Sequence, residues 1–468
     1  MAFAYTVKAT ILKINIYIIA KKMKTREEIL TKERLEYVRE RRSTLRESAY
    51  AEVKEKIGVS ALDEMRRLYD IFDEKIYIWL SGLWDRDAGA FYYSESARDT
   101  HLYLPDIEST VQALKFLNTS GMIRAGEGNY ITRIPTFVRD GVVKFAHSLQ
   151  DPDGYFYHPQ WGKNISVSRR GRDLSWAKNL LLEAGEKPRY LLPTEKAPDG
   201  KKSASLPEYL QNIEAFKKYL GEMDLTKDSY YIGNIIESTV SQISAAGKEF
   251  ESYLTEWLNS QNRADNGLWE TQINYASVNG LMKMSGNYPH LRAVLPHAKA
   301  SLTSAISAAI SDERMKFVCE AYNPWAAIGN IFKANKDAPD KLELDALRKH
   351  LIDNAPALIR KTREKIAVFR KTDGSYSYFK RMSCAVSQRA PAAVPRTNEG
   401  DVNATTICVG STVRSMRTAL NIPAIPIFAP EDGDLFFELL ECAPKIEKKF
   451  YIGDTFPEKP SYEEEIAE

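Results

Sequence analysis

The chain has 468 residues, of which 44% are hydrophobic and 11% aromatic, with 65 basic and 63 acidic side chains. This composition is ample for a sizeable core, and the net charge of only +2 argues against a general attraction to nucleic acid or to membranes. The four cysteines form no C-x-x-C pair and the six histidines no H-x-x-x-H arrangement. We therefore expect no disulfide framework, no metal site and no cofactor.

The first residues, 1–24, are apolar but interrupted by Lys8 and Lys13. A signal peptide carries its charges before the apolar run, and a membrane-spanning helix needs about 20 clean apolar residues, so neither pattern fits. We expect a non-native or upstream start with Met23 as the natural first residue, which predicts a cytoplasmic protein. Export through a weak N-terminal signal is the alternative.

Residues 25–58 are rich in Glu, Lys and Arg at helical spacing, and their apolar stripe is thin. This pattern predicts a charged N-terminal helix that lies across the outside of the protein. Because acidic and basic residues alternate, a nucleic-acid-binding arm is disfavoured. An amphipathic helix is expected next, over residues 61–80.

The stretch 106–121, D-I-E-S-T-V-Q-A-L-K-F-L-N-T-S-G, predicts a helix with Asp106 as its N-cap and Gly121 as its C-cap. A related string returns at residues 236–247, and weaker echoes occur at 274–286 and 403–421. A repeated helix with its polar residues at one end suggests a ring of equivalent inner helices whose polar ends meet.

Amphipathic segments alternate with these strings, and we expect outer helices at 134–150, 207–220, 249–261, 290–310 and 342–369, with a further inner helix at 172–185. Turns at Asp153-Gly154, Asn266-Gly267 and Asp373-Gly374 suit chain reversals that need a positive φ. The resulting prediction is an all-α fold of six hairpins, an (α/α)6 toroid, over residues 59–430. Residues 431–468 are expected to form an extended strap and an acidic tail.

A helix ending in Gln or Asn, then an Asp-Gly-aromatic turn, then an inward helix resembles the α/α-toroid class. This class includes terpenoid cyclases, protein prenyltransferases, six-hairpin glycosidases and heparinase-like polysaccharide lyases. The resemblance covers most of residues 60–430 and implies architecture more than chemistry, because the toroid hosts unrelated reactions. A D-x-D-D string is missing, and Cys408 has no suitable His near it in sequence, which disfavours a cyclase and a prenyltransferase.

In such a ring the front ends of the inner helices line one mouth of a funnel, and the densest polar cluster spans residues 155–173. In the manner of heparinase-like lyases, Tyr157 and His158 would remove the proton α to a uronic carboxyl group and protonate the leaving oxygen. Asn164 or Arg169 would neutralise that carboxyl group. The structural alternative is a loop held to the body by aromatic and ionic contacts.

Carboxylates form the second constellation, and Asp106 and Glu108 are its catalytic candidates. Two carboxylates held across the funnel would make a glycoside hydrolase, whereas helix capping and helix–helix hydrogen bonding are the structural alternatives. The expected substrate-binding residues are aromatic, amide, arginine and carboxylate side chains at the same mouth: Trp84, Tyr93, Trp161, Arg172, Trp269, Asn274, Tyr275, Tyr322, Asn323, Asp401 and Asn403.

The favoured function is a carbohydrate-active enzyme that acts on uronic-acid-containing saccharides by β-elimination. The alternatives are a glycoside hydrolase with a carboxylate pair and a non-catalytic glycan-binding or scaffold toroid. The expected partner is an acidic oligosaccharide, with no nucleic acid and no membrane. Catalysis predicts charged groups that face each other across the funnel, and scaffolding predicts the same groups bonded in caps and interhelical pairs.

Overall fold

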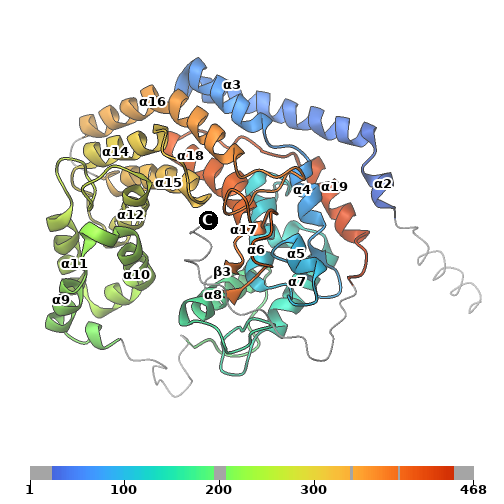
Figure 1. Ribbon diagram of the computed structural model, residues 1–468, viewed down its shortest axis with the longest axis horizontal. Helices are drawn as coiled ribbons and strands as arrows, with labels where there is room; N and C mark the ends of the chain where they lie inside the picture. Colours follow the sequence, from blue (N-terminus) through green and yellow to red (C-terminus); the bar gives the residue numbers. More distant parts are fainter. Residues whose placement is uncertain (1–23, 194–206, 338–340, 388–389, 447–468) are drawn as a thin grey trace, which may run out of the picture.

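The computed structural model describes residues 24–193, 207–337, 341–387 and 390–446 (Figure 1). The expectations for the first 23 residues and for the acidic tail beyond residue 446 lie outside these ranges. The described chain is predominantly helical with two short antiparallel strand pairs, which confirms the all-α prediction. Within these ranges no helix combines the length and the apolar character needed to cross a membrane.

The elements follow in chain order. The helices up to the middle of the chain are α2 (Arg26–Ile29), α3 (Lys32–Asp70), α4 (Lys75–Ser81), α5 (Glu95–Asp99), α6 (Ile107–Ser120), α7 (Thr136–Ser148), α8 (Val167–Glu183), α9 (Ile213–Gly221) and α10 (Leu225–Ala246). They are followed by α11 (Lys248–Gln261), α12 (Tyr275–Ser285), α13 (Tyr288–Leu291), α14 (Ala298–Ile310), α15 (Cys319–Ala334), α16 (Lys341–Ala367), α17 (Val402–Thr405), α18 (Thr412–Leu420) and α19 (Pro430–Glu441). The paired strands are β1 (Trp84–Asp85) with β2 (Ala90–Phe91) and β3 (Val386–Ser387) with β4 (Ala390–Pro391). Short 3-10 turns η1 (Tyr130–Arg133) and η2 (Glu208–Leu210) and a π-helical turn η3 (Thr406–Ser411) complete the list.

Helix α3 contains the expected charged helix and continues past it. Gly58, the expected end, adopts φ 78° and ψ 171° and kinks the helix there. The amphipathic helix expected over 61–80 is divided between the second part of α3 and α4. Helix α3 packs on α16 and α19 at the edge of the molecule (Figure 1). The buried Arg42 holds it there by ion pairs to Glu74 (2.8 Å) and Asp432 (3.2 Å).

Helix α6 forms as the sequence predicts. The Asp106 carboxylate accepts the backbone N–H of Ser109 at 2.7 Å, and Gly121 adopts φ 96° beyond the last turn. Side chains all round the first turns of α6 are buried, which is typical of a helix enclosed by others.

Two of the related strings begin their helices in the same way. Asn274 caps α12 through Ser277 N–H, and Asp401 caps α17 through Ala404 N–H. The string at 236–247 is different, because α10 begins at Leu225 with Asp224 as its cap. The front of this string, expected at the start of an inner helix, therefore lies in the middle of α10, which corrects the prediction.

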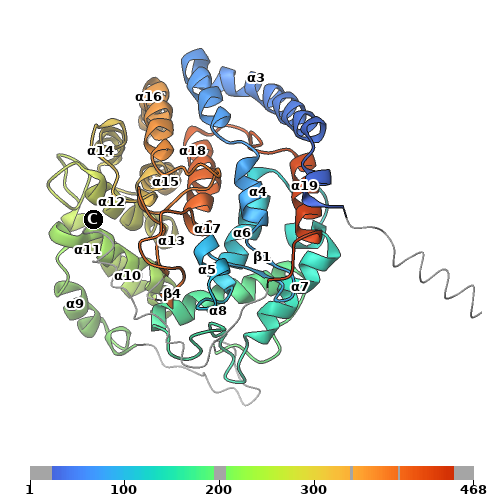
Figure 2. The same cartoon turned by 45° about the vertical axis from the view of Figure 1, so that its right-hand side comes forward.

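The long helices alternate between the periphery and the middle of the molecule. The pairs are α4 with α6, α7 with α8, α9 with α10, α11 with α12, α14 with α15, and α16 with α18. In both views the second member lies nearer the middle (Figure 1, Figure 2). Contacts between inner helices run in the order α10, α12, α15, α18, η3, α6 and α8, so helices from both ends of the chain meet at α6.

Backbone hydrogen bonds also join residues 93–94, before α6, to residues 401–402, at the start of α17. Val402 N–H donates to Tyr93 O at 3.0 Å, and Ser94 forms a bridge with Asp401. The start of α17 is thereby fixed beside the segment that leads into α6.

The expected turns use their glycines as predicted: Gly154, Gly267 and Gly374 have φ between 67° and 92°. Gly374 also lies against α4, where an added Cβ would be 2.5 Å from Lys75 Cβ and 2.8 Å from Ile76 N. The last of these turns therefore docks on the first peripheral helix. After it, residues 430–441 form α19 and not the extended strap that was expected.

We expect Gly374→Ala to destabilise the fold by about 2–4 kcal/mol, because it combines a positive φ with a close backbone neighbour. Urea denaturation followed by circular dichroism measures this free energy of unfolding. Gly221→Ala is the matched control, since Gly221 lies in a helix with nothing within 4 Å of the added Cβ. Equal effects of the two substitutions would contradict the proposed docking role of the turn.

Candidate functional site

The polar cluster at 155–173 is not a single loop. Ser166 accepts Arg169 N–H at 3.1 Å and caps α8, which begins at Val167. The first turns of this helix therefore carry Arg169, Arg172 and Asp173. Residues three or four apart in a helix lie on the same face. Arg169 and Asp173 are four residues apart and bond to each other.

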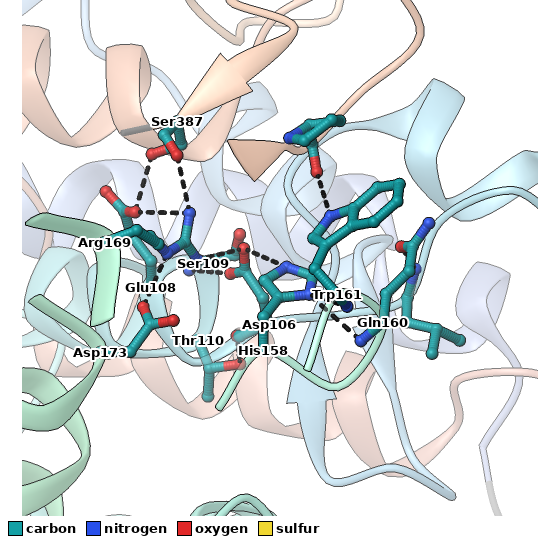
Figure 3. Close-up of polar contacts among 12 residues, drawn as sticks. Asp106, Glu108, Ser109, Thr110, His158, Gln160, Trp161, Arg169, Asp173 and Ser387 are labelled. Carbon is teal, nitrogen blue, oxygen red and sulfur yellow. Dashed lines mark hydrogen bonds and ion pairs between the residues drawn. The ribbon is translucent and has the colours of Figure 1, made fainter. Parts of the chain in front are cut away.

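The fully buried Arg169 guanidinium is the centre of an ionic network at the start of α6 (Figure 3). It lies 2.9 Å from Asp106 Oδ2, 3.2 Å from Glu108 Oε2 and 2.7 Å from Asp173 Oδ1. It also donates to Ser387 O at 2.9 Å. One cation thus connects α6, α8 and the β3 strand.

Glu108 is fully buried and extends this network toward the inner helices. Its carboxylate accepts from Arg172 Nη2 at 2.7 Å, from Ser387 Oγ at 2.7 Å and from Gln112 Nε2 at 3.2 Å. Gln112 also donates to Asn403 Oδ1 at 3.0 Å. The structure therefore brings together Asp106, Glu108, Arg169, Arg172 and Asn403 among the expected site residues.

His158 joins the same network from the segment before α8. It is 3% exposed, and its Nε2 lies 3.4 Å from Asp106 Oδ2. Its Nδ1 accepts the backbone N–H of Gln160 (3.2 Å) and Trp161 (3.4 Å), which assigns the proton to Nε2. Burial lowers the pKa of His158 against the opposing effect of Asp106. Both ring nitrogens are therefore engaged inside the protein.

The network shifts the pKa values of the Asp106 and Asp173 carboxyl groups in opposite directions. Burial alone would raise the pKa of Asp106, but Arg169 and His158 outweigh burial and hold that pKa well below its usual value. Burial raises the pKa of Asp173 to about 7, although Arg169 opposes it. Three carboxylates surround one guanidinium, so their mutual repulsion favours the protonation of one of them, Asp173.

The other members of the 155–173 cluster lie apart from each other. Tyr157 donates from its hydroxyl to Asp153 Oδ2 at 2.8 Å, beside the turn and not beside His158. The Asn164 side chain is exposed. Trp161 is half-buried and donates from Nε1 to Pro391 O at 3.0 Å. The expected pairing of Tyr157 with His158 on one reacting group is therefore not present in this arrangement.

Several expected substrate-binding residues are core or capping residues. Trp84 is buried against Phe91, with ring centroids 4.9 Å apart, and Trp269 donates from Nε1 to Leu258 O. Asn323 donates to Asn279 Oδ1 at 2.8 Å in an interhelical pair. The buried Asp401 accepts three backbone N–H groups, including that of Tyr378, and burial raises its pKa to about 7.

Buried polar atoms without a hydrogen-bond partner occur in several parts of the described chain, and five of them belong to residues in or near the network at the start of α6. These five are Tyr93 Oη, Ser109 Oγ, Gln112 Oε1, Arg172 Nε and Asp173 Oδ2. Burial raises the pKa of Tyr93 well above its usual value, and Asp401 raises it further, so this phenol stays protonated. A buried polar group without a hydrogen bond is energetically unfavourable. These atoms can therefore still form hydrogen bonds, with water or with a ligand.

Three cations from neighbouring helices form what we call the cation patch: Lys115 of α6, Arg172 of α8 and Arg414 of α18. Two of them contact the Trp176 ring, with Lys115 Nζ 4.4 Å and Arg172 Cζ 5.4 Å from its centroid. Burial lowers the pKa of Lys115, and Arg414 and Arg172 lower it further against the opposing Glu183. In the described chain, no carboxylate lies within ion-pair distance of Lys115 or Arg414.

Two half-buried tyrosines lie close enough to interact with this patch. Burial raises the pKa of Tyr230 on α10 to about 12, and Arg172 opposes that shift. Burial likewise raises the pKa of Tyr322 on α15, and Arg414 opposes it. Cations and phenols from separate inner helices therefore face a common region.

The sequence contained a signal for part of the cation patch. Glu108, Gln112 and Lys115 follow one another at four- and three-residue spacing, so Lys115 is expected on the same face of α6 as Glu108. The predicted helix at 172–185 begins five residues later than α8, so the prediction did not place Arg169 on the same helix face as Asp173. Arg414 had no local signal, because only the tertiary fold brings η3, and α18 after it, to α6.

Comparison with known proteins gives no match: no family model, no curated protein and no solved structure resembles this chain significantly.

We expect Arg169→Met to destabilise the protein by about 3–5 kcal/mol, because it leaves Asp106, Glu108 and Asp173 buried without their common partner. Urea denaturation at pH 7.5 measures the change. The control is Arg170→Met on the same helix turn, where the guanidinium is half-buried and stacks 5.0 Å over Tyr155. A cost of less than about 1 kcal/mol for the Arg169 variant would show that the network is dispensable.

The raised pKa of Asp173 predicts a pH dependence of stability. Its pKa is about 7 in the folded state and 3.8 in the unfolded reference, so the stability gained by its protonation disappears as pH rises from 4 through 7. Asp173→Asn cannot ionise, and relative to the wild type its free energy of unfolding should rise by roughly 1–3 kcal/mol from pH 4 to pH 8. The exposed Asp140→Asn should follow the wild type throughout. Parallel curves for wild type and Asp173→Asn would refute the assignment.

Proposed function

We propose that this chain is an α/α toroid that binds an acidic saccharide at the cation patch and cleaves it by β-elimination. The architecture is supported by the alternation of peripheral and inner helices and by the docking of the Gly374 turn on α4. The observation that carries the function is the convergence of Lys115, Arg172 and Arg414 with two of the three cations unpaired.

The chemistry of the patch favours an anionic ligand. Bringing cations together is unfavourable, and a bound carboxylate would relieve their repulsion. Arg172 is bonded to Glu108 through Nη2 alone, and its side chain remains 32% exposed, so it retains donors for a uronic carboxylate. Tyr230 and Tyr322 add amphipathic rings of the kind that pack on sugars.

The same residues have the properties that β-elimination requires. Arg172 neutralises the uronate carboxyl group, which makes the neighbouring C–H acidic. The Lys115 amine takes that proton, and burial together with Arg414 and Arg172 shifts its pKa downward, in the direction that suits a base. The C–H electron pair forms the new C=C bond as the bond to the glycosidic oxygen breaks. Tyr322 gives its proton to the leaving oxygen and recovers one from water.

Hydrolysis by a carboxylate pair fits the site less well. Such a pair must face the sugar from two sides, with the carboxyl groups about 5–9.5 Å apart. Asp106 and Glu108 instead share the Arg169 guanidinium, and Asp401 is bonded to three backbone N–H groups. Saccharide binding without catalysis is the second candidate, because Asp106, Asn274 and Asp401 act as helix caps.

We expect absorbance at about 232 nm to rise when the protein is incubated with a uronate-containing polysaccharide, because elimination creates a conjugated C=C bond. Lys115→Met should reduce the rate at least 100-fold, and Arg172→Ala should raise KM, since it removes the carboxylate contact. Lys144→Met is the control, because Lys144 is exposed on the peripheral helix α7.

Isothermal titration calorimetry with the same saccharides separates the two candidates. Binding that Arg172→Ala weakens, without any product, would favour the non-catalytic saccharide-binding toroid. Neither binding nor product with any member of an acidic panel would contradict the proposal.

A further inference from the structure

A half-buried lysine, Lys365, lies near the end of α16 and is not part of the cation patch. Lys365 Nζ donates to the Tyr275 hydroxyl at 2.5 Å and to Ala309 O at 3.0 Å. It also lies 4.7 Å from the centroid of the Tyr275 ring. Three elements therefore converge on one half-buried amine: α12 with Tyr275, α14 with Ala309 and α16 itself.

This ammonium lacks the partner that a lysine in such a place normally has. Across the described ranges, no carboxylate lies within 4.0 Å of Lys365 Nζ. Lys361, one turn earlier on the same face, pairs with Asp312 at 2.7 Å and with Glu364 at 4.0 Å. A desolvated amine beside a second cation is the arrangement that favours a neutral, nucleophilic lysine.

The nearby acidic groups are engaged elsewhere. Glu313 accepts Tyr275 N–H at 3.1 Å, and Glu320 accepts Lys316 N–H at 2.6 Å. Burial lowers the pKa of Lys365 to about 8, with Lys361 adding to the shift and Glu313, Asp312 and Glu320 opposing it. A large share of the amine is therefore neutral at pH 7.5–8, whereas an unperturbed lysine is well below 1% neutral there.

We propose that Lys365 is an imine-forming lysine that captures a small aldehyde. The Nζ lone pair attacks the carbonyl carbon to give a carbinolamine, and the loss of water leaves a C=N bond between ligand and lysine. Tyr275 Oη, adjacent to Nζ, delivers the proton with which the hydroxyl leaves as water. The proton released by nitrogen returns to the phenol, so the reaction needs no oxidant or reductant.

Reductive alkylation of the full chain tests this site. The protein is incubated with propanal and cyanoborohydride at pH 7.5, and peptide mass spectrometry follows alkylation of each lysine with time. Lys365 should be alkylated at least tenfold faster than Lys361 or the exposed Lys144, with a rate that is half-maximal near pH 8. A rate equal to that of Lys361, or a midpoint above pH 10, would overturn the proposal.

Variants separate the role of the surroundings from simple exposure. Lys361→Met removes the neighbouring cation and should slow alkylation of Lys365 at pH 7.5 severalfold while shifting its midpoint upward. Tyr275→Phe should slow imine formation, which a borohydride quench at timed intervals measures by converting the imine present at each time to a stable secondary amine. If neither variant changes the Lys365 rate while both unfold at the wild-type urea concentration, exposure alone accounts for the labelling and the proposal is wrong.

Discussion

The structure depends on the burial of one guanidinium. Arg169 is enclosed by carboxylates from two helices and by a strand carbonyl, and these partners come from three parts of the chain: the start of α6, α8 itself and β3. Such a group is tolerated inside a protein only when nearly all its N–H groups are matched, so the surrounding segments have little freedom to move. The start of α6, the start of α8 and β3 are consequently held in one arrangement. Because Arg172 lies on α8 and Lys115 on α6, this arrangement also fixes the positions of these two cations.

The cation patch is the solvent-facing continuation of this buried network. Glu108 contacts Arg169 on its inner side and Arg172 on its outer side, so one carboxylate connects the structural ions to those available to a ligand. Lys115 and Arg172 both contact the Trp176 ring. The buried charges around Arg169 are neutralised within the fold, whereas the charges of the cation patch are left for a partner.

Local patterns predicted the helices well and the site only in part. Caps and turn glycines are short-range devices, and Asp106 and Gly374 act as their sequence context predicted, whereas Asn274 and Asp401, which were expected to bind substrate, are helix caps. The pairing of Arg169 with Asp106 spans 63 residues, and that of Arg169 with Ser387 spans 218, so no local pattern encodes either of them. The sequence also could not separate a cap from a catalytic carboxylate, because both call for an aspartate at the front end of a helix.

The docking of the Gly374 turn on α4 has a consequence for how the chain folds. Lys75 and Gly374 meet only after almost 300 residues have been synthesised between them, as their positions in the sequence show. A contact of such long range carries a large loop-closure entropy and forms late. During synthesis the apolar inner faces of the early helices therefore remain without their final neighbour, and this is the interval in which the chain is most exposed to aggregation and to chaperone capture.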